Sequence, residues 1–460
     1  MNIALIIPPS PGRTNIIRMI DCSHEAKANY LWQPNDFMII TSRAEPDDDV
    51  QFVDGTADAL DNDQFLELID AVRGDLVIIA LSSVCWESDY AYFLKVKERF
   101  AAIPLYVLGD IFLEEAYRRH ILEHCDGIIV NPYVLDLRSL ATQRKDRTGR
   151  LSGVCITADG PLFPEGKRAV AVTSSPPRHE LFQKTGYRFP FAMHVRFTTV
   201  TTMWGCPFTC TYCSDSKFPP ILRSYEDVLR ELVHVANLGI REIFFADKVF
   251  GFNRKSIDPL LATMRERFSF SWSCYFHPQL CDRNLLQDMK AAGCHTIIIG
   301  VDSADVRSLK RYRRYTEREQ VERVIAEAND LRIDVCADFI LGLEHEDEAD
   351  ILRTIEYALE IPIDFASFNI AAPLPGSDIR RSMNEAGVLK FGREGFDTCG
   401  RSGILGNRNI TARRLRELRK TAFRRFYLRP SYLLRRLRRT RSVEHLLIQV
   451  QEMISMIRKI

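Results

Sequence analysis

The alternation of short apolar runs with amphipathic helical patterns constrains the fold of this chain more than any other feature. A run such as 75–80 (DLVIIA) is apolar throughout, which is typical of a strand buried on both faces of a parallel sheet. Helices that connect successive parallel strands cover those faces. The predicted strands are 2–7, 50–53, 75–80, 104–108 and 127–130 in a first series, and 197–201, 242–245, 271–275, 296–300, 335–341 and 365–370 in a second.

Two α/β units follow from this pattern. The first series predicts a doubly wound, Rossmann-like domain over residues 1–140. The second series has six βα units, fewer than the eight of a closed barrel, and predicts a partial (βα)6 barrel over residues 191–400. Residues 141–190 contain a charged run followed by Gly and Pro clusters, so we expect a linker between the two domains. Residues 401–460 are predicted to form a basic helical C-terminal region.

The cysteines indicate reduced thiols and not a disulfide framework. The N-terminus has no basic start, and Pro8 and Pro9 interrupt its short apolar run, which is not the pattern of a secretory signal. The sequence has no run of 18 apolar residues that would predict a membrane-spanning helix. We therefore expect a cytoplasmic protein. Nine of the 12 cysteines are scattered singly, and the other three are Cys206, Cys210 and Cys213.

These three cysteines have the spacing C-x3-C-x2-C, which can wrap a tight loop around one inorganic cluster, since thiolates are the usual ligands of iron–sulfur centres. A structural zinc site would need a fourth ligand at matched spacing, and the next His or Cys downstream is His234. Three ligands on a four-iron cluster leave one iron open to a substrate or cofactor. The alternatives are a structural zinc loop and a chance grouping.

The segment 204–213 resembles the signature of the radical SAM superfamily, and residues 195–380 resemble its partial barrel. This resemblance implies a 4Fe–4S cluster bound by Cys206, Cys210 and Cys213. It also implies S-adenosylmethionine (SAM) as cofactor, cleaved reductively to a 5′-deoxyadenosyl radical that abstracts hydrogen from the substrate. An external one-electron donor of the flavodoxin or ferredoxin type would supply the electron.

Further segments after the cysteines resemble the cofactor-binding strands of the same family. The stretch 239–247 resembles the second-strand segment, and 373–377 resembles the loop after the sixth strand. In the fourth-strand segment Asp302 replaces the usual Glu, so the ribose contact departs from the family pattern. These positions also have structural alternatives. An Asp at a strand end is often only a helix cap, and a Gly-Leu pair after an apolar run is often only a turn. The resemblance implies SAM contacts from Tyr212, Asp247, Gly300, Asp302, Ser303, Ile340 and Gly342.

The first domain, taken with the barrel, resembles the radical SAM subfamily that carries a cobalamin-binding domain. That subfamily includes methylases of unactivated carbon, and also cyclases. No histidine lies in the D-x-H-x-x-G pattern that supplies an axial ligand. The fourth and fifth predicted strands end in Gly109-Asp110 and Asn131-Pro132 where the subfamily commonly has more glycines. Two alternatives stay open: cobalamin-dependent methyl transfer, or cyclisation, rearrangement or dehydrogenation with a degenerate cobalamin domain.

Substrate residues and partners are less constrained. Tyr275 and His277 are the candidate catalytic residues, and Asp338 and Asn369 could also face the cavity. Residues 411–460 carry 15 Lys/Arg and 3 Asp/Glu, interleaved with leucines and aromatics. This pattern fits a membrane-surface helix and a lipid-like substrate, a nucleic-acid surface, or a helical cap whose arginines pair with the acidic body. We favour the cap and do not expect nucleic acid as a partner. A cluster-bearing redox sensor is the non-enzymatic alternative.

Overall fold

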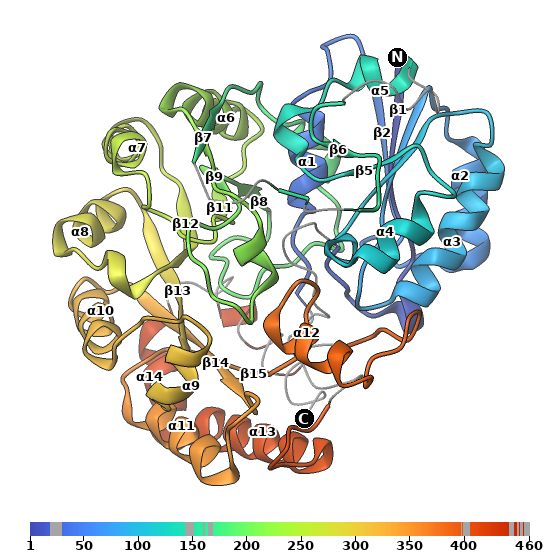
Figure 1. Cartoon of the computed structure of the whole chain (residues 1–460). Helices are drawn as coiled ribbons and strands as arrows, with labels where there is room; N and C mark the ends of the chain where they lie inside the picture. Colours follow the sequence, from blue (N-terminus) through green and yellow to red (C-terminus); the bar gives the residue numbers. More distant parts are fainter. Residues whose placement is uncertain are drawn as a thin grey trace.

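The computed structural model describes residues 1–18, 30–142, 151–159, 162–163, 169–396, 398, 405–440, 446–448, 450 and 454, and for 437–439 the backbone alone. The chain forms two α/β units side by side, with the C-terminal helices beneath the second (Figure 1). The α/β class and the two parallel sheets predicted from the sequence are confirmed. Cys22, His24 and Cys399, and most of the tail beyond 440, lie outside the described residues.

The N-terminal unit is a six-stranded sheet in the order β2-β1-β3-β4-β5-β6. Its first five strands are parallel, and β6, which the sequence did not predict, pairs antiparallel with β5. The order 2-1-3-4-5 places a topological switch point between β1 and β3, where ligands of such sheets bind. The elements are β1 Asn2–Ile7, α1 Asn35–Thr41, β2 Asp49–Asp54, α2 Asn62–Ala71, β3 Leu76–Ala80, α3 Trp86–Arg99, β4 Leu105–Leu108, α4 Glu115–Ile121, β5 Gly127–Ile129, α5 Leu137–Thr142 and β6 Val154–Cys155.

The second unit is a six-stranded parallel sheet in the order β15-β14-β13-β12-β11-β8, wrapped on its outer face by helices (Figure 1). All six strands were predicted from their apolar runs. Its elements are β8 Phe197–Val200, α6 Tyr225–Asn237, β11 Glu242–Phe245, α7 Arg254–Arg267, β12 Ser271–Phe276, α8 Arg283–Ala291, β13 Cys294–Asp302, α9 Val306–Arg311, α10 Arg318–Asp330, β14 Asp334–Leu341, α11 Glu348–Glu360, β15 Phe365–Ile370, α12 Asp378–Glu385, α13 Ala412–Tyr427 and α14 Pro430–Arg439.

A small three-stranded sheet joins the intervening segment to the barrel. It has the order β7-β10-β9, with β7 Val170–Val172, β10 Ile221–Arg223 and β9 Met203–Trp204. The described part of the intervening segment is also tied down by side chains, because buried His179 contacts Thr198 at 2.7 Å and Glu231 at 2.9 Å. Residues 143–150, 160–161 and 164–168 of this segment lie outside the described residues.

One hydrophobic core spans the two units. It joins residues of β1 and β3 with Phe197, Trp204, Phe244 and Ile298 on the inner side of the barrel. The Trp204 indole N–H donates to Asp36 at the start of α1, at 3.0 Å. The shared core therefore packs one face of the N-terminal sheet and the barrel strands into one hydrophobic cluster.

Candidate functional site

The three motif cysteines lie in the loop that follows β9. Gly205 has φ +75°, and a Cβ there would lie 2.3 Å from the Pro219 carbonyl oxygen, so only glycine fits where the loop passes this segment. The Cys206 N–H donates to Phe218 O at 3.2 Å, and the Cys213 N–H donates to Cys210 O at 3.3 Å. Cys206, Cys210 and Cys213 all line one cavity, so the three thiols face a common space. None of the three forms a disulfide. Among the described residues, no His, Cys, Asp and Glu side chains are gathered as closely as the ligands of a bound metal ion.

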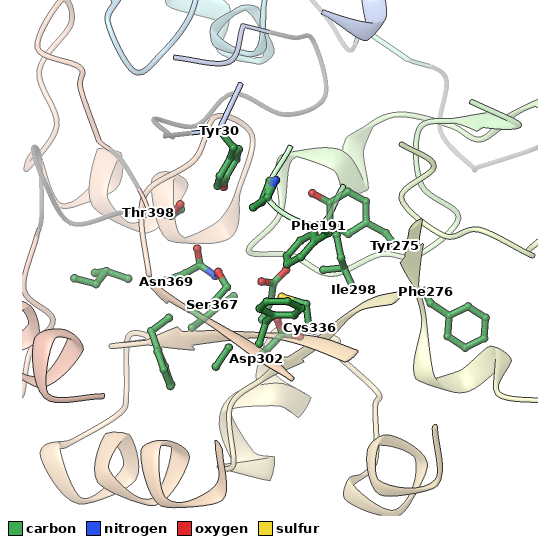
Figure 2. A pocket seen from close by; sticks show the side chains of 18 of the residues that line it. Tyr30, Phe191, Tyr275, Phe276, Ile298, Asp302, Cys336, Ser367, Asn369 and Thr398 are labelled. Atoms are coloured by element: carbon green, nitrogen blue, oxygen red, sulfur yellow. The ribbon is translucent and has the colours of Figure 1, made fainter. Parts of the chain in front are cut away.

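The cysteines open into a cavity of about 600 Å³ inside the barrel. This volume suits a drug-sized or cofactor-sized ligand. Figure 2 shows Tyr275, Ile298, Cys336, Ser367 and Asn369, from four successive strands, around a common space with Tyr30 of the N-terminal unit on its far side. The walls are mainly apolar and aromatic. The aromatic lining residues are Tyr30, Trp32, Phe189, Phe191, Phe208, Tyr212, Tyr275, Phe276, Phe365, Phe368, Phe423, Tyr427 and Tyr432.

The structure brings four of the seven sequence-predicted cofactor residues to this cavity. Tyr212, Gly300, Asp302 and Ile340 line it with the cysteines. Tyr212 packs edge-on against Tyr312, with ring centroids 5.9 Å apart. Asp247, Ser303 and Gly342 are not among the lining residues.

Asp247 is 1% exposed and organises the backbone just before the cysteine loop. Its carboxylate accepts from the N–H of Thr202 at 2.7 Å and from that of Met203 at 3.2 Å, and it also contacts the Thr202 hydroxyl. Burial raises the pKa of Asp247 to about 6, against the opposing effect of these hydrogen bonds. A direct contact with the amino group of SAM stays a prediction.

Ser303 and Gly342 are joined by Glu346, a buried carboxylate that sequence reasoning missed. Glu346 accepts from the Ser303 hydroxyl at 2.6 Å and from the Gly342 N–H at 2.9 Å. Burial raises its pKa to about 7. Gly342 has φ +84°, and a Cβ there would lie 2.6 Å from Leu415 of α13. This glycine therefore allows the C-terminal helix to dock on the strand end.

A buried arginine that the motifs did not predict, Arg314, contacts the end of the fourth barrel strand, β13. Arg314 is 7% exposed and lines the cavity. Its Nε donates to Asp302 at 2.7 Å, its Nη2 donates to Gly300 O at 2.6 Å, and its Nη1 contacts His277 Nε2. It was missed because it follows α9, outside every strand-end motif, within an arginine-rich stretch that resembles a solvated helix face.

The candidate substrate residues all line the cavity, namely Tyr275, His277, Asp338 and Asn369. His277 stacks on Phe208 of the cysteine loop, with ring centroids 3.9 Å apart. Burial and the neighbouring Arg314 guanidinium lower the pKa of His277 to about 2. The ring is therefore neutral at physiological pH, so it does not act as a proton donor from the imidazolium form.

The carboxyl ends of the N-terminal strands are filled by the chain's own side chains. Arg18 lies in the β1/β3 crevice, where it pairs with Asp89 at 2.8 Å and 2.9 Å and donates to Thr56 at 2.7 Å. Both members of this ion pair have fully buried side chains. Beside it, the hydroxyl of Ser83, which follows β3, donates to Asp110, which follows β4, at 2.5 Å, and burial raises the pKa of Asp110 to about 7.

The glycines at these strand ends also serve the chain's own packing. A Cβ on Gly109 would lie 1.8 Å from the Leu81 carbonyl oxygen, and one on Gly55 would lie 2.6 Å from Pro9 N. The segment after α12 covers the same edge, because the Gly395 N–H donates to Ser83 O at 3.2 Å. None of these strand-end residues is among those that line the barrel cavity.

The described C-terminal helices close the barrel and pair their arginines with its acidic residues. On α13, Arg414 contacts Glu348 at 2.5 Å and Arg425 contacts Glu356 at 2.9 Å. On α14, Arg435 and Arg436 pair with Asp364 and Asp334, at 3.1 Å and 3.0 Å. No helix of the described chain has both the length and the apolar character needed to cross a membrane.

Residues 200–358 match the model of the Radical SAM superfamily. An uncharacterized methyltransferase of Pyrococcus horikoshii is 25% identical to this chain over 453 residues, which cover 95% of the chain and 94% of that relative. An anaerobic magnesium-protoporphyrin IX monomethyl ester cyclase of Rubrivivax gelatinosus is 25% identical over 369 residues, 76% of this chain and 66% of the cyclase.

Two solved structures share the two-unit fold. The radical S-adenosylmethionine methyltransferase TsrM from Kitasatospora setae, with cobalamin and a 4Fe–4S cluster bound, superposes with a TM-score of 0.63 at 15% identity, over 84% of this chain and 78% of TsrM. The cobalamin-dependent S-adenosylmethionine radical enzyme OxsB gives a TM-score of 0.62 at 14% identity, over 99% of this chain and 71% of OxsB. At these identities the likeness shows the fold.

Proposed function

We propose that this member of the radical SAM superfamily, whose two-unit fold is shared with cobalamin-dependent radical SAM enzymes, methylates an unactivated carbon of a largely apolar substrate. One observation carries the site: Cys206, Cys210 and Cys213 open into the same cavity as Tyr212 and Gly300. The methyltransferase relative that covers almost the whole chain supports the reaction class. Radical SAM enzymes act on a substrate and need a one-electron donor, and the proposed donor here is of the flavodoxin or ferredoxin type.

The residues of the cavity fit this chemistry. The three thiols would hold the cluster, and Tyr212, Gly300 and Ile340 would contact SAM. When bound, a 4Fe–4S cluster supplies the electron that breaks the sulfonium–C5′ bond of SAM, and the resulting 5′-deoxyadenosyl radical abstracts hydrogen from the substrate. The aromatic walls would exclude water from the cavity and hold an apolar substrate there.

Cobalamin is the proposed methyl carrier of the N-terminal domain, on the support of the shared fold with cobalamin-bound TsrM. The described strand ends do not by themselves form a site for it. Arg18 fills the β1/β3 crevice, and the strand-end hydroxyls and carboxylates are hydrogen-bonded within the chain. This observation favours a second candidate function, namely radical SAM cyclisation, rearrangement or dehydrogenation without cobalamin.

Metal and product counts on anaerobically reconstituted protein distinguish the two candidates. Both predict about four iron atoms per chain and formation of 5′-deoxyadenosine. Methyl transfer with cobalamin also predicts about one cobalt per chain and S-adenosylhomocysteine as a second product. Iron without cobalt, with 5′-deoxyadenosine alone, would select the second candidate. A chain that binds iron but does not cleave SAM under reducing conditions would contradict both.

We propose in addition that the substrate is lipid-like and reaches the cavity beside the C-terminal helices, at an anionic membrane surface. Leu428, Leu433, Leu446 and Val450 line the cavity and are nevertheless 58%, 46%, 39% and 38% exposed. Residues 411–460 are strongly basic, which suits anionic lipid headgroups. The pairing of several of these arginines with barrel carboxylates supports the alternative of a simple cap.

A vesicle flotation assay tests this surface. We expect the chain to float with vesicles that contain anionic lipid and to stay in solution with zwitterionic ones, because leucine burial and arginine attraction act together. Leu433→Glu with Leu434→Glu should reduce flotation about tenfold, by adding charge to an inserted apolar face. The matched control is Leu68→Glu, a 43% exposed leucine on α2 of the N-terminal unit. Equal flotation of both variants, or none for the unaltered chain, would favour the cap.

A further inference from the structure

The backbone at the end of β13 makes room for the Arg314 side chain, and the Asp302 carboxylate pairs with that side chain. A Cβ on Gly300 would lie 2.7 Å from the Arg314 Nη2, so the glycine provides the space that the guanidinium occupies. The pairing of β13 with β14 shifts register between Gly300 and Asp302. Asp302 has φ +67°, a left-handed conformation that is costly for a residue with a side chain. The bulge and the unusual backbone aim the Asp302 carboxylate at Arg314.

Asp302 and the Gly300 carbonyl orient the guanidinium whichever tautomer His277 adopts. The Gln279 N–H donates to His277 Nδ1 at 3.3 Å, while Arg314 Nη1 faces His277 Nε2. A neutral imidazole carries one N–H and can accept at only one nitrogen, so it cannot accept from both groups. The carboxylate and the carbonyl accept from Arg314 without this conflict.

Arg314 lies beside the cysteine loop. The Thr211 N–H, next to Cys210, donates to Tyr312 O at 2.9 Å, and Cys210 and Arg314 both line the cavity. Arg314 Nη1 faces His277, whose ring stacks on Phe208 of the loop, whereas Asp302 accepts at Nε. Lys248, another cation that lines the cavity, lies 3.5 Å from Asp215, which partly compensates its charge. The ion pair of Arg314 and Asp302 therefore presents its positive end to the cysteine loop.

We propose that Arg314 is the fixed positive charge that favours the reduced state of the cluster held by Cys206, Cys210 and Cys213, and that Asp302 is its positioning residue. Reduction adds one electron from the external donor and makes the cluster more negative by one charge. A nearby buried cation stabilises that state, because a charge in a poorly hydrated site is weakly screened. This inference rests on the proposed function, since it requires the cluster.

The test is a redox titration of the reconstituted protein, monitored by the electron paramagnetic resonance of the reduced cluster. At a fixed solution potential, Arg314→Gln should lower the ratio of reduced to oxidised cluster about tenfold, a shift of about 59 mV for one electron. Arg314→Lys keeps the charge and should stay within about threefold of the unaltered protein. The matched control is Arg311→Gln, at the end of the preceding helix α9, where the side chain is 54% exposed.

The sign of the change in Asp302→Asn separates positioning from charge compensation. If Asp302 positions Arg314, the reduced fraction falls, and Arg314→Gln with Asp302→Asn falls no further than Arg314→Gln alone. A rise in the reduced fraction would overturn the positioning role. If Arg314→Gln keeps the potential of the unaltered protein, the electrostatic role is wrong.

If Arg314→Gln loses the cluster, the redox titrations of Arg314→Lys and Asp302→Asn decide the proposal. Arg314→Lys preserves the charge of the arginine, and Asp302→Asn preserves the size of the aspartate. Failure of the unaltered chain to take up iron or cleave SAM would contradict the proposed function instead. The two failures are therefore distinguishable.

Discussion

Replacing any one of Cys206, Cys210 and Cys213 by alanine is expected to abolish the iron–sulfur chromophore and lower 5′-deoxyadenosine formation by more than about 100-fold. Loss of residues that merely support a metal ligand costs about 10–100-fold, and loss of a ligand itself should cost more. The measurement is iron content and the absorbance of anaerobically reconstituted protein, followed by product analysis.

The control for this prediction is Cys281→Ala. Cys281 is also a free, partly buried cysteine, but it is not among the residues that line the barrel cavity. It should keep its iron and its product yield. If Cys281→Ala loses iron to the same extent, or if a motif variant keeps a full cluster, the assignment of the ligands is wrong.

The second large effect is expected in the N-terminal unit, where Arg18→Ala or Asp89→Ala should destabilise the fold by about 3–5 kcal/mol. The ion pair is fully buried, and removal of one partner leaves an uncompensated charge in the interior. Asp89 also accepts from the Ser82 N–H at 2.8 Å, so its removal leaves a buried backbone donor unpaired. Urea denaturation of each variant measures the free energy of unfolding.

Two controls separate burial from charge pairing. Arg99→Ala removes an exposed partner of Asp70, with side chains 43% and 72% exposed, and should change the stability by less than about 1 kcal/mol. Arg18→Met with Asp89→Leu replaces both charges and should be less destabilising than either alanine variant. A single alanine variant as stable as the unaltered chain would contradict the buried-pair interpretation.

The same pair bears on cobalamin. Arg18 fills the crevice at the topological switch point, so a ligand that enters between β1 and β3 must displace it. Cobalt in the unaltered protein would mean that this edge rearranges or that cobalamin lies outside the crevice. The cobalt content of the reconstituted protein therefore also reports on how the N-terminal strand ends accommodate a ligand.

The sequence by itself determined the fold class and singled out the three candidate cluster cysteines. Continuous apolar runs give parallel strands because both faces of such a sheet are buried, and this local signal predicted every strand of the barrel sheet. The cysteine spacing is equally local, since three thiolates within eight residues need no long-range contact to form one loop. Short elements such as β6 and β7 were missed because pairing with distant strands, and not their own pattern, makes them strands.

Only the tertiary structure decided which side chains share the cavity. Arg314 reaches the cysteine loop because Gly300 lacks a side chain and Asp302 turns toward it, and no spacing rule in the sequence carries that relation. Arg18 and Asp89 lie 71 residues apart in the chain and meet because β1 and β3 are neighbours in the sheet. The apolar pattern that predicts a strand or a helix lies within a short stretch of sequence, whereas the partners of a buried charge depend on the order of distant strands in the sheet.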